Sequence, residues 1–319
     1  MVEPSQSRNP YVFVLGCQRS GTSLLRQMLD AHPNLAVTSD TEFIPRMLAR
    51  DAPADVKLDS DLVERAIAYR TRSGRAGFDN LGLPDDTARR LGEKANTYAE
   101  FVCLLFDEVA ASHGKAMAGD KTPDYCRYVP LLHDLFPWAR FVDIVRDGRD
   151  VALSMLRWAK TGPRGPVRTV VWQENPVAAC ALWWCDMVSI AARDGARIGD
   201  GLYMRIRYED LIAEPEAALT QVADFMGLPF AAEMLRYYEG KQQAWRPGET
   251  SNLPPTAGLR AWRQQMEHDD LEVFESLAGA LLRELGYDRA VSMVSAQREE
   301  QALEWRRRWG QKLDPTAGR

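Results

Sequence analysis

The sequence predicts an α/β fold, in which a mostly parallel sheet carries helices on both faces. Strand-like and helix-like patterns alternate along the chain, which is typical of this class. A glycine-bounded loop also joins the first strand to the first helix, as in domains that bind phosphate groups. The 319 residues are 45% hydrophobic and 27% charged, which suits one large globular domain with a subdomain that caps it.

The first strand, loop and helix predict a site for an anion. Residues 11–15 form an apolar run typical of a buried strand, and residues 22–29 have helical periodicity. Gly16 and Gly21 bound the tight loop between them. Backbone N–H groups converge in such a loop, and the helix dipole favours a negative charge there.

The spacing of this loop resembles the nucleotide-binding loop of kinases and ATPases, but one residue differs. Gly16 and Gly21 keep the spacing G-x-x-x-x-G, whereas Thr22 stands where those enzymes have lysine. That lysine holds the β- and γ-phosphates during phosphoryl transfer. A kinase with Asp143 as its magnesium-linked acid is therefore a disfavoured alternative, and a nucleotide-binding module without catalysis is another.

The remaining elements follow from periodicity and from Gly and Pro positions. We expect strands near residues 35–38, 115–118, 140–145 and 202–206. We expect helices near residues 43–50, 61–69, 87–112, 128–136, 150–158, 176–193, 216–225, 271–285 and 295–312, with loops at 161–174 and 240–258. A flexible tail (1–10) then precedes a domain of residues 11–287, which contains a partly helical cap at about 51–112, and a helical extension follows at 288–319.

Composition excludes some classes of partner. The net charge of −5 argues against a nucleic-acid binder. The five cysteines show no disulfide or metal spacing, and the four histidines are scattered, so we expect free thiols and no metal site. No signal-peptide pattern and no stretch of ~18 apolar residues is present. We therefore expect a cytoplasmic protein without a membrane span, and the sequence leaves open whether it is a homodimer.

A second anion-binding signal follows the predicted strand at residues 140–145. Arg146 leaves the end of that strand, where ligands of open α/β sheets bind, and Ser154 lies in the next helix. A guanidinium fork and a hydroxyl suit a phosphate. Alternatively, Arg146 and Arg149 pair with Asp147 and Asp150. Together with the first loop, this motif indicates a ligand with two separated anionic groups.

With these two motifs in this order, the chain resembles the sulfotransferases that use 3′-phosphoadenosine-5′-phosphosulfate (PAPS). The resemblance covers about residues 11–287, and it is closest to the tyrosylprotein sulfotransferase branch and its bacterial relatives. The segments that carry it are residues 16–26, 29–33, 44–46 and 145–149. It implies a P-loop-like three-layer domain and a transfer that needs no metal. The products would be a sulfate ester and adenosine 3′,5′-bisphosphate.

The resemblance also assigns residues to the donor. It implies that the 5′-phosphosulfate is held by Arg19, Ser20, Gly21, Thr22 and Ser23, and the 3′-phosphate by Arg146 and Ser154. Tyr208 resembles a family tyrosine near the adenine, with a core tyrosine as the alternative. Arg260 either reaches the 3′-phosphate or forms a surface salt bridge.

Sulfuryl transfer needs a base for the acceptor hydroxyl and cations for the developing charge. The family's catalytic glutamate falls on Asp40, which is one methylene shorter, and Glu42 is the second candidate base. Lys121 resembles a family lysine that stabilises the bridging oxygen, and Arg19 neutralises charge on the transferring group.

The acceptor is expected to be a small molecule, a glycolipid head group or a natural product, with protein-tyrosine sulfation as the alternative. Glu42 stands where the tyrosine-sulfating branch carries an arginine, so it disfavours an acidic peptide. The cap and the loop at residues 240–258 are expected to define the acceptor site.

Overall fold

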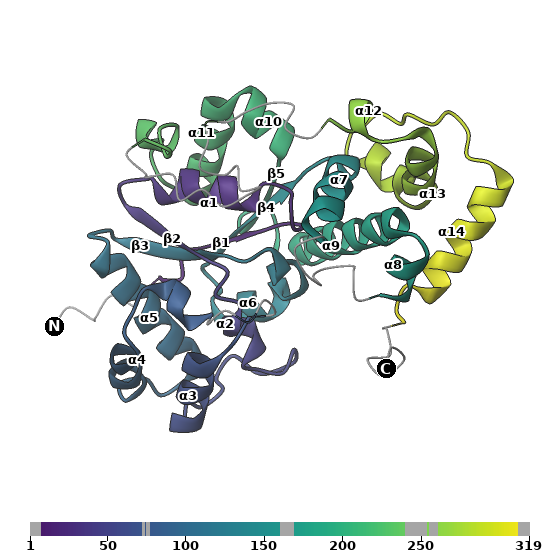
Figure 1. Ribbon diagram of the computed structural model, residues 1–319. Helices are drawn as coiled ribbons and strands as arrows, with labels where there is room; N and C mark the ends of the chain where they lie inside the picture. The colour runs from purple at the N-terminus through teal and green to yellow at the C-terminus, as the bar shows by residue number, and fades with distance from the viewer. Residues whose placement is uncertain are drawn as a thin grey trace. The chain divides into compact units, whose positions relative to one another are not determined.

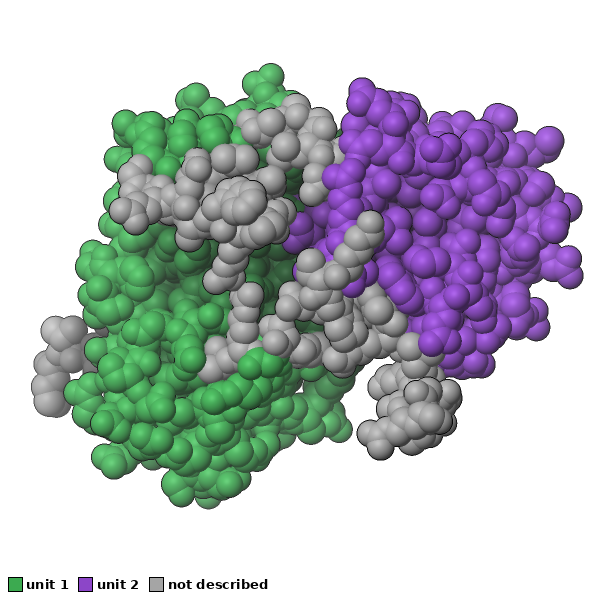
Figure 2. Space-filling view, viewed as in Figure 1, with its two compact units in different colours: residues 1–16, 21–145, 190–256 green, residues 17–20, 146–189, 257–319 purple. Residues whose placement is uncertain are grey.

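The computed structural model describes residues 8–71, 74, 77–159, 169–239, 254 and 261–311. The chain divides into two compact units, coloured separately in Figure 2. Unit 1 comprises residues 1–16, 21–145 and 190–256, and it contains the sheet. Unit 2 comprises residues 17–20, 146–189 and 257–319, and its regular elements are helices.

Unit 1 is built on a sheet of five parallel strands in the order β2-β3-β1-β4-β5. The strands are β1 (Val12–Leu15), β2 (Leu35–Ser39), β3 (Met117–Lys121), β4 (Arg140–Val145) and β5 (Tyr203–Arg207). Because all five strands run the same way, their carboxyl ends lie at one edge of the sheet, where ligands of such folds bind. The predicted α/β fold class is confirmed.

Helices cover both faces of this sheet (Figure 1). On one face, α1 (Thr22–Asp30), α10 (Tyr208–Ala213) and α11 (Pro215–Met226) pack apolar side chains against Val12 and Val14 of β1. On the other face, the ring of Phe13 contacts the rings of Tyr125, Phe136 and Phe141, and α5 (Tyr98–Ser112) packs on β2 and β3. This division follows from the alternation of side chains along β1.

Unit 1 also contains seven shorter elements among its described residues. They are α2 (Phe43–Arg46), α3 (Ser60–Ala68), η1 (Phe78–Leu81), α4 (Asp85–Gly92), η2 (Pro123–Arg127), α6 (Val129–Leu135) and η4 (Ala232–Met234).

Unit 2 packs around a buried ion-pair network. Its helices are α7 (Gly148–Ala159), α8 (Val170–Glu174), the first part of α9 (Pro176–Ile198), α12 (Trp262–Gln265), α13 (His268–Glu284) and α14 (Ala296–Arg308). The Arg149 side chain is 1% exposed and forms ion pairs with Asp147 (2.8 Å) and Glu275 (2.7 Å). Its guanidinium carbon lies 3.6 Å from the centre of the Trp262 ring. Arg149 is therefore a buried structural residue.

Three sequence predictions about helices are wrong. The long helix expected at residues 87–112 is two helices, because Thr97 and Glu100 form a reciprocal capping box that starts α5 anew. The helix expected at 43–50 ends at Arg46, and the predicted loop at 161–174 contains α8. The sequence analysis also missed α10. Of the loop at 240–258, only residue 254 is described.

Within the described part of the chain, no helix has the length and apolar character needed to cross a membrane. The cytoplasmic location expected from the sequence stays a prediction.

Candidate functional site

The loop after β1 depends on its two glycines for close packing. Gly16 has φ +147°, and a Cβ there would lie 2.4 Å from the carbonyl oxygen of Ile144 in β4. Gly21 has φ +100°, and its Cβ would lie 2.4 Å from a ring carbon of Tyr208. Other residues do not fit such positions. The structure therefore brings Tyr208, which the sequence singled out, against the predicted donor loop.

The predicted donor loop presents groups that suit an anion. Ser20 is fully buried, and its hydroxyl has no hydrogen-bond partner among the described residues. Helix α1 begins at Thr22, and its N-cap residue Gly21 has no side chain to satisfy the first N–H groups. Since a buried polar atom normally has a partner, the Ser20 hydroxyl suits a hydrogen bond to an oxyanion, and the first N–H groups of α1, taken by themselves, also favour an anion.

Within unit 2, the structure joins the two anion motifs. Arg19 Nε donates a hydrogen bond to Ser154 Oγ over 3.0 Å. The guanidinium of Arg19 also lies 5.9 Å from the ring centre of Trp158. These contacts bring Arg19 of the predicted donor loop beside Ser154 of the second motif.

Arg146, which directly follows β4, is held from two sides. Its Nη2 donates to Asp150 over 3.2 Å, and its carbonyl oxygen accepts a hydrogen bond from the Trp184 indole over 3.1 Å. Asp150 in turn accepts from the backbone N–H of Trp262, and burial raises the pKa of Asp150. The pairing of Arg146 with Asp150 that the sequence offered as an alternative is present, and it holds the guanidinium against α7.

The carboxyl ends of β2 and β3 bring Asp40 and Lys121 together. Ser39 of β2 is the register partner of Lys121 in β3, so Asp40 follows directly beside it. Lys121 Nζ lies 2.8 Å from Asp40 Oδ1, and the Asp40 N–H donates to the Lys121 carbonyl over 2.6 Å. The lysine side chain is 2% exposed, whereas the aspartate side chain is 46% exposed. Asp40 thus provides the partner that a buried ammonium needs and remains accessible to a reactant.

Three residues predicted to be catalytic have strained backbones. Among the described residues, the non-glycine residues with positive φ are Arg19 (73°), Asp40 (55°) and Glu42 (56°). A side chain in this conformation costs about 1–3 kcal/mol, and such residues cluster at functional sites. The strain therefore supports a functional role for the segments that follow β1 and β2.

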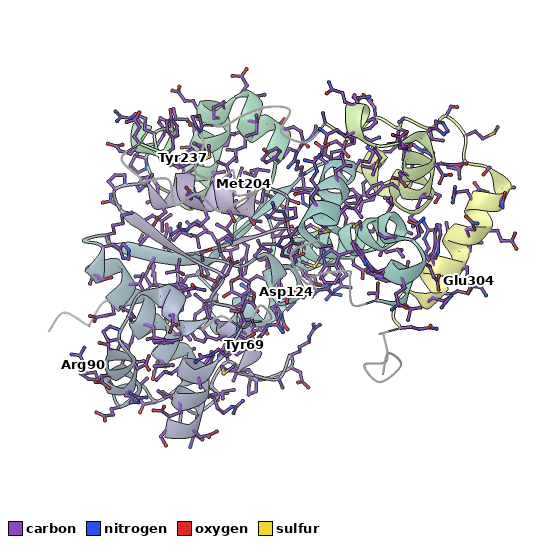
Figure 3. All side chains as sticks on the ribbon, viewed as in Figure 1. Tyr69, Arg90, Asp124, Met204, Tyr237 and Glu304 are labelled. Carbon is purple, nitrogen blue, oxygen red and sulfur yellow. The ribbon has the colours of Figure 1, made fainter. Side chains whose placement is uncertain are left out.

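Asp40 and Glu42 have different partners. Glu42 accepts a hydrogen bond from Tyr69 over 3.3 Å and lies 3.8 Å from Arg46 Nε. Arg46 also forms an ion pair with Asp124. Figure 3 labels Tyr69 and Asp124, which stand at the two ends of this chain of contacts. Only the Asp40 carboxylate contacts Lys121 among the described pairs.

The sequence analysis missed Asp120, because it ended the third strand at residue 118. In the structure β3 continues through Lys121, and Asp120 is fully buried. Its carboxylate accepts hydrogen bonds from Thr38 (2.6 Å), Thr41 (3.0 Å) and Thr122 (2.9 Å). Burial raises the pKa of Asp120. The position of this acid directly before Lys121 was the available signal.

Three further sequence predictions concern a kinase-type acid, a metal site and Arg260. Asp143, the magnesium-linked acid of the kinase alternative, is buried and pairs with Arg205 (2.7 Å) and Tyr203 (2.6 Å), which disfavours that role. In the part of the chain that the structure describes, no group of three or more His, Cys, Asp or Glu side chains is arranged to hold a metal ion. Arg260 lies outside the described residues.

Comparison with known proteins decides the family. The model of the sulfotransferase family matches residues 10–232, which is more than half of the chain. The chain belongs to the sulfotransferase family. The family predicted from the sequence, the PAPS-dependent sulfotransferases, is thereby confirmed, and this sulfotransferase is an enzyme of that type.

This sulfotransferase is similar in sequence to the following three proteins. Protein-tyrosine sulfotransferase A of Caenorhabditis elegans is 24% identical over 88% of this chain and 68% of its own length. Protein-tyrosine sulfotransferase 2 of Gallus gallus is 25% identical over 88% and 70%. Nodulation protein NoeE of Sinorhizobium fredii is 26% identical over 88% and 66%.

Solved structures share the fold. The sulfotransferase domain of the Synechococcus PCC 7002 olefin synthase has a TM-score of 0.59 at 22% identity, over 87% of this chain and 94% of that one. The sulfotransferase domain from the curacin biosynthetic pathway has a TM-score of 0.52 at 20% identity, over 93% and 97%. These similarities support the predicted three-layer architecture.

The packing of Gly21 on Tyr208 generates a stability prediction. Gly21→Ala should lower the free energy of unfolding by more than the ~1–2 kcal/mol of left-handed backbone strain, because its Cβ also meets the Tyr208 ring. Gly114→Ala is the matched control, since Gly114 has φ +64° with open space around it. Urea denaturation of both variants makes the comparison. Equal losses would contradict the close approach of Tyr208.

Proposed function

We propose that this sulfotransferase moves a sulfuryl group from PAPS to an acceptor hydroxyl, with Asp40 as the base and Lys121 as the cation beside it. The observation that carries the proposal is the Asp40–Lys121 pair, an accessible carboxylate held 2.8 Å from a buried ammonium at the ends of neighbouring strands. A base must lie within hydrogen-bond reach of the proton it takes, and a cation must face the charge that develops.

The donor site combines the two anion motifs. The 5′-phosphosulfate would be held by Arg19, Ser20, Gly21, Thr22 and Ser23, and the 3′-phosphate by Arg146 and Ser154. The buried Ser20 hydroxyl supports this assignment, since it has no partner among the described residues. Tyr208, which packs on Gly21, would lie near the adenine. Arg260 stays a prediction for the 3′-phosphate.

The reaction is an in-line displacement at sulfur. The acceptor oxygen forms a bond to sulfur while the bond from sulfur to the 5′-phosphate oxygen breaks. The electron pair of that bond leaves with adenosine 3′,5′-bisphosphate, and the hydroxyl proton goes to Asp40. Lys121 and Arg19 neutralise negative charge on the bridging oxygen and the transferring group, while Arg146 and Ser154 orient the donor from its far end.

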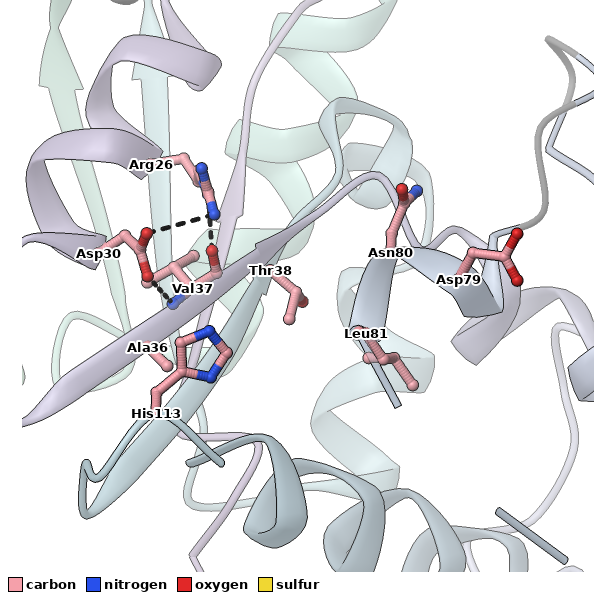
Figure 4. Close-up of a pocket in the computed structure, with 10 residues that line it drawn as sticks. Arg26, Asp30, Ala36, Val37, Thr38, Asp79, Asn80, Leu81 and His113 are labelled. Carbon is pink, nitrogen blue, oxygen red and sulfur yellow. Dashed lines mark hydrogen bonds and ion pairs between the residues drawn. The ribbon is translucent and has the colours of Figure 1, made fainter. Parts of the chain in front are cut away.

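For the acceptor we propose a hydroxylated small molecule, glycolipid head group or natural product. A cavity of about 340 Å³ lies beside the edge strand β2 (Figure 4). Its lining combines apolar residues of β2 and η1 with polar ones, which are Arg26, Asp30, Thr38, Asp79, Asn80 and His113. Asn80 Nδ2 donates to the Asp40 carbonyl over 2.9 Å, so the wall of this cavity is tied to the base. The non-reacting part of such an acceptor would bind here.

Protein-tyrosine sulfation is the second candidate. It is supported by the relatives named protein-tyrosine sulfotransferases. The negative charge of Glu42 disfavours an acidic peptide as the acceptor, although Arg46 Nε at 3.8 Å partly offsets that charge.

An acceptor panel separates the two candidates. We expect incubation with PAPS to add the mass of one SO₃ to a sugar or a natural-product alcohol, and not to an acidic tyrosine peptide, measured by mass spectrometry. Asp79→Ala should raise the acceptor KM and leave the PAPS KM unchanged, because Asp79 lines the cavity. Asp85→Ala, which changes an exposed acid on α4, is the control. Sulfation of the peptide alone would replace our proposal by the second candidate.

The donor assignment predicts the effect of losing Arg146. Arg146→Ala should weaken binding of adenosine 3′,5′-bisphosphate by about 2–4 kcal/mol, because the 3′-phosphate loses a charged partner. Isothermal titration calorimetry without magnesium measures this, and ATP should bind weakly in the same assay. Arg193→Ala removes an exposed arginine of α9 and should leave the affinity unchanged. An unchanged affinity in Arg146→Ala would remove Arg146 from the donor site.

The base assignment predicts different results for two acids. Asp40→Asn should lower kcat by roughly 10²-fold or more, because the amide cannot take the acceptor proton. Glu42→Gln should retain most of the activity, since Glu42 contacts Tyr69 and Arg46 and not Lys121. Steady-state kinetics with the best acceptor of the panel measures both. The reverse order would assign the base to Glu42.

A further inference from the structure

Asp120 is a buried acid to which the proposed reaction gives no role. It is fully buried in β3, and it forms no ion pair with any described residue. Its carboxylate instead accepts hydrogen bonds from the hydroxyls of three threonines. Burial of a carboxylate without a cation is unfavourable and raises its pKa, as it does for Asp120. The presence of this unfavourable buried carboxylate beside Lys121 therefore needs a structural or functional explanation.

The three threonines belong to different segments, and one of them lies in the strained turn. Thr38 is part of β2 and Thr122 directly follows β3. Thr41 lies between Asp40 and Glu42, both of which have left-handed backbones. Its hydroxyl lies 3.0 Å from Asp120 Oδ2 and 3.1 Å from the hydroxyl of Tyr125. The hydrogen bond of Thr41 therefore ties the turn at residues 39–43 to β3.

Two adjacent residues of β3 hold this turn from opposite faces of the sheet. Successive side chains of a strand point to opposite faces. Asp120 is in register with Thr38, and Lys121 is in register with Ser39. Asp120 holds the turn through Thr41, while Lys121 holds it through the Asp40 carboxylate and through the Asp40 N–H.

We propose that Asp120 is a positioning residue, which acts through Thr41 to keep the turn at residues 39–43 in the conformation that sets Asp40 against Lys121. This inference rests on the proposed roles of Asp40 and Lys121. A left-handed backbone at two non-glycine residues is unfavourable by itself, so it needs contacts that hold it. The hydrogen bond from Thr41 to the fixed carboxylate is such a contact, and a base displaced by a small distance loses much of its effect.

The test compares two hydroxyls on the same carboxylate oxygen. Thr41→Val and Thr122→Val each remove one hydrogen bond to Asp120 Oδ2, of 3.0 Å and 2.9 Å, at two buried positions, and Thr41→Val also removes the contact with the Tyr125 hydroxyl. Only Thr41 belongs to the turn. Thr41→Ser keeps the hydroxyl and serves as the rescue variant. The readouts are kcat with the best panel acceptor, the Kd of adenosine 3′,5′-bisphosphate, the thermal midpoint, and amide hydrogen exchange of the peptide that contains residues 39–43.

We expect Thr41→Val to lower kcat by roughly 10- to 100-fold, with the Kd of the bisphosphate unchanged. Exchange of the Asp40 amide should speed up, because its bond to the Lys121 carbonyl is no longer held. Thr41→Ser should restore the wild-type kcat and the wild-type exchange rate of the Asp40 amide. Thr122→Val should lower the thermal midpoint to a similar extent without a comparable loss of kcat.

Asp120→Asn provides the second variant. The near-isosteric amide replaces one acceptor oxygen by an NH2 donor, so the three threonine hydroxyls can no longer all donate to residue 120; the hold on Thr41 weakens and kcat should fall, with the Kd of the bisphosphate unchanged. Equal losses of kcat in Thr41→Val and Thr122→Val, or wild-type exchange at Asp40 in Thr41→Val, would overturn the inference. If Asp40→Asn retains full activity, the proposed role of Asp40 as the base is wrong. Amide exchange at Asp40 in Thr41→Val would still test whether Thr41 holds the turn.

Discussion

The parallel register between β2 and β3 is the constraint on which the candidate site depends. It sets Ser39 opposite Lys121, so the residue after β2 meets the last residue of β3. Gly119 makes the neighbouring pairing with β1 possible, because a Cβ there would lie 2.2 Å from the carbonyl oxygen of Val12. A shift of one residue would turn Lys121 to the other face of the sheet and separate it from Asp40.

Backbone strain gathers in the segments that follow β1 and β2. Regular strands end at Leu15 and Ser39, and the chain then adopts left-handed backbones at Arg19, Asp40 and Glu42. Local propensity disfavours each of these conformations, and a folded protein keeps them where tertiary contacts hold them and function uses them. The contacts are visible for the second segment, where Lys121 and Thr41 fix the turn.

Arg146 and Arg149 illustrate how neighbours of one residue type take different roles. Both follow β4, but Arg149 is enclosed by Asp147, Glu275 and the Trp262 ring. Arg146 stays at the strand end with Asp150 as its ion-pair partner in the described chain. A charge enclosed by two acids is committed to structure, because removing any partner leaves a buried charge uncompensated. Position relative to the strand end thus separates a structural arginine from a candidate ligand-binding one.

The sequence by itself determined the α/β class, the strand, loop and helix around Gly16 and Gly21, and the family, because these depend on local periodicity, glycine spacing and motif order. The tertiary structure alone decided that Asp40 meets Lys121 while Glu42 meets Arg46 and Tyr69. It likewise decided that Asp120 is buried among threonines that are distant in sequence. The contacts of Lys121 with Asp40 and of Asp120 with Thr38 and Thr41 join residues about eighty positions apart, so they depend on strand register, which periodicity does not encode. The helix break before Tyr98 is the opposite case, since its capping box is local and could be predicted.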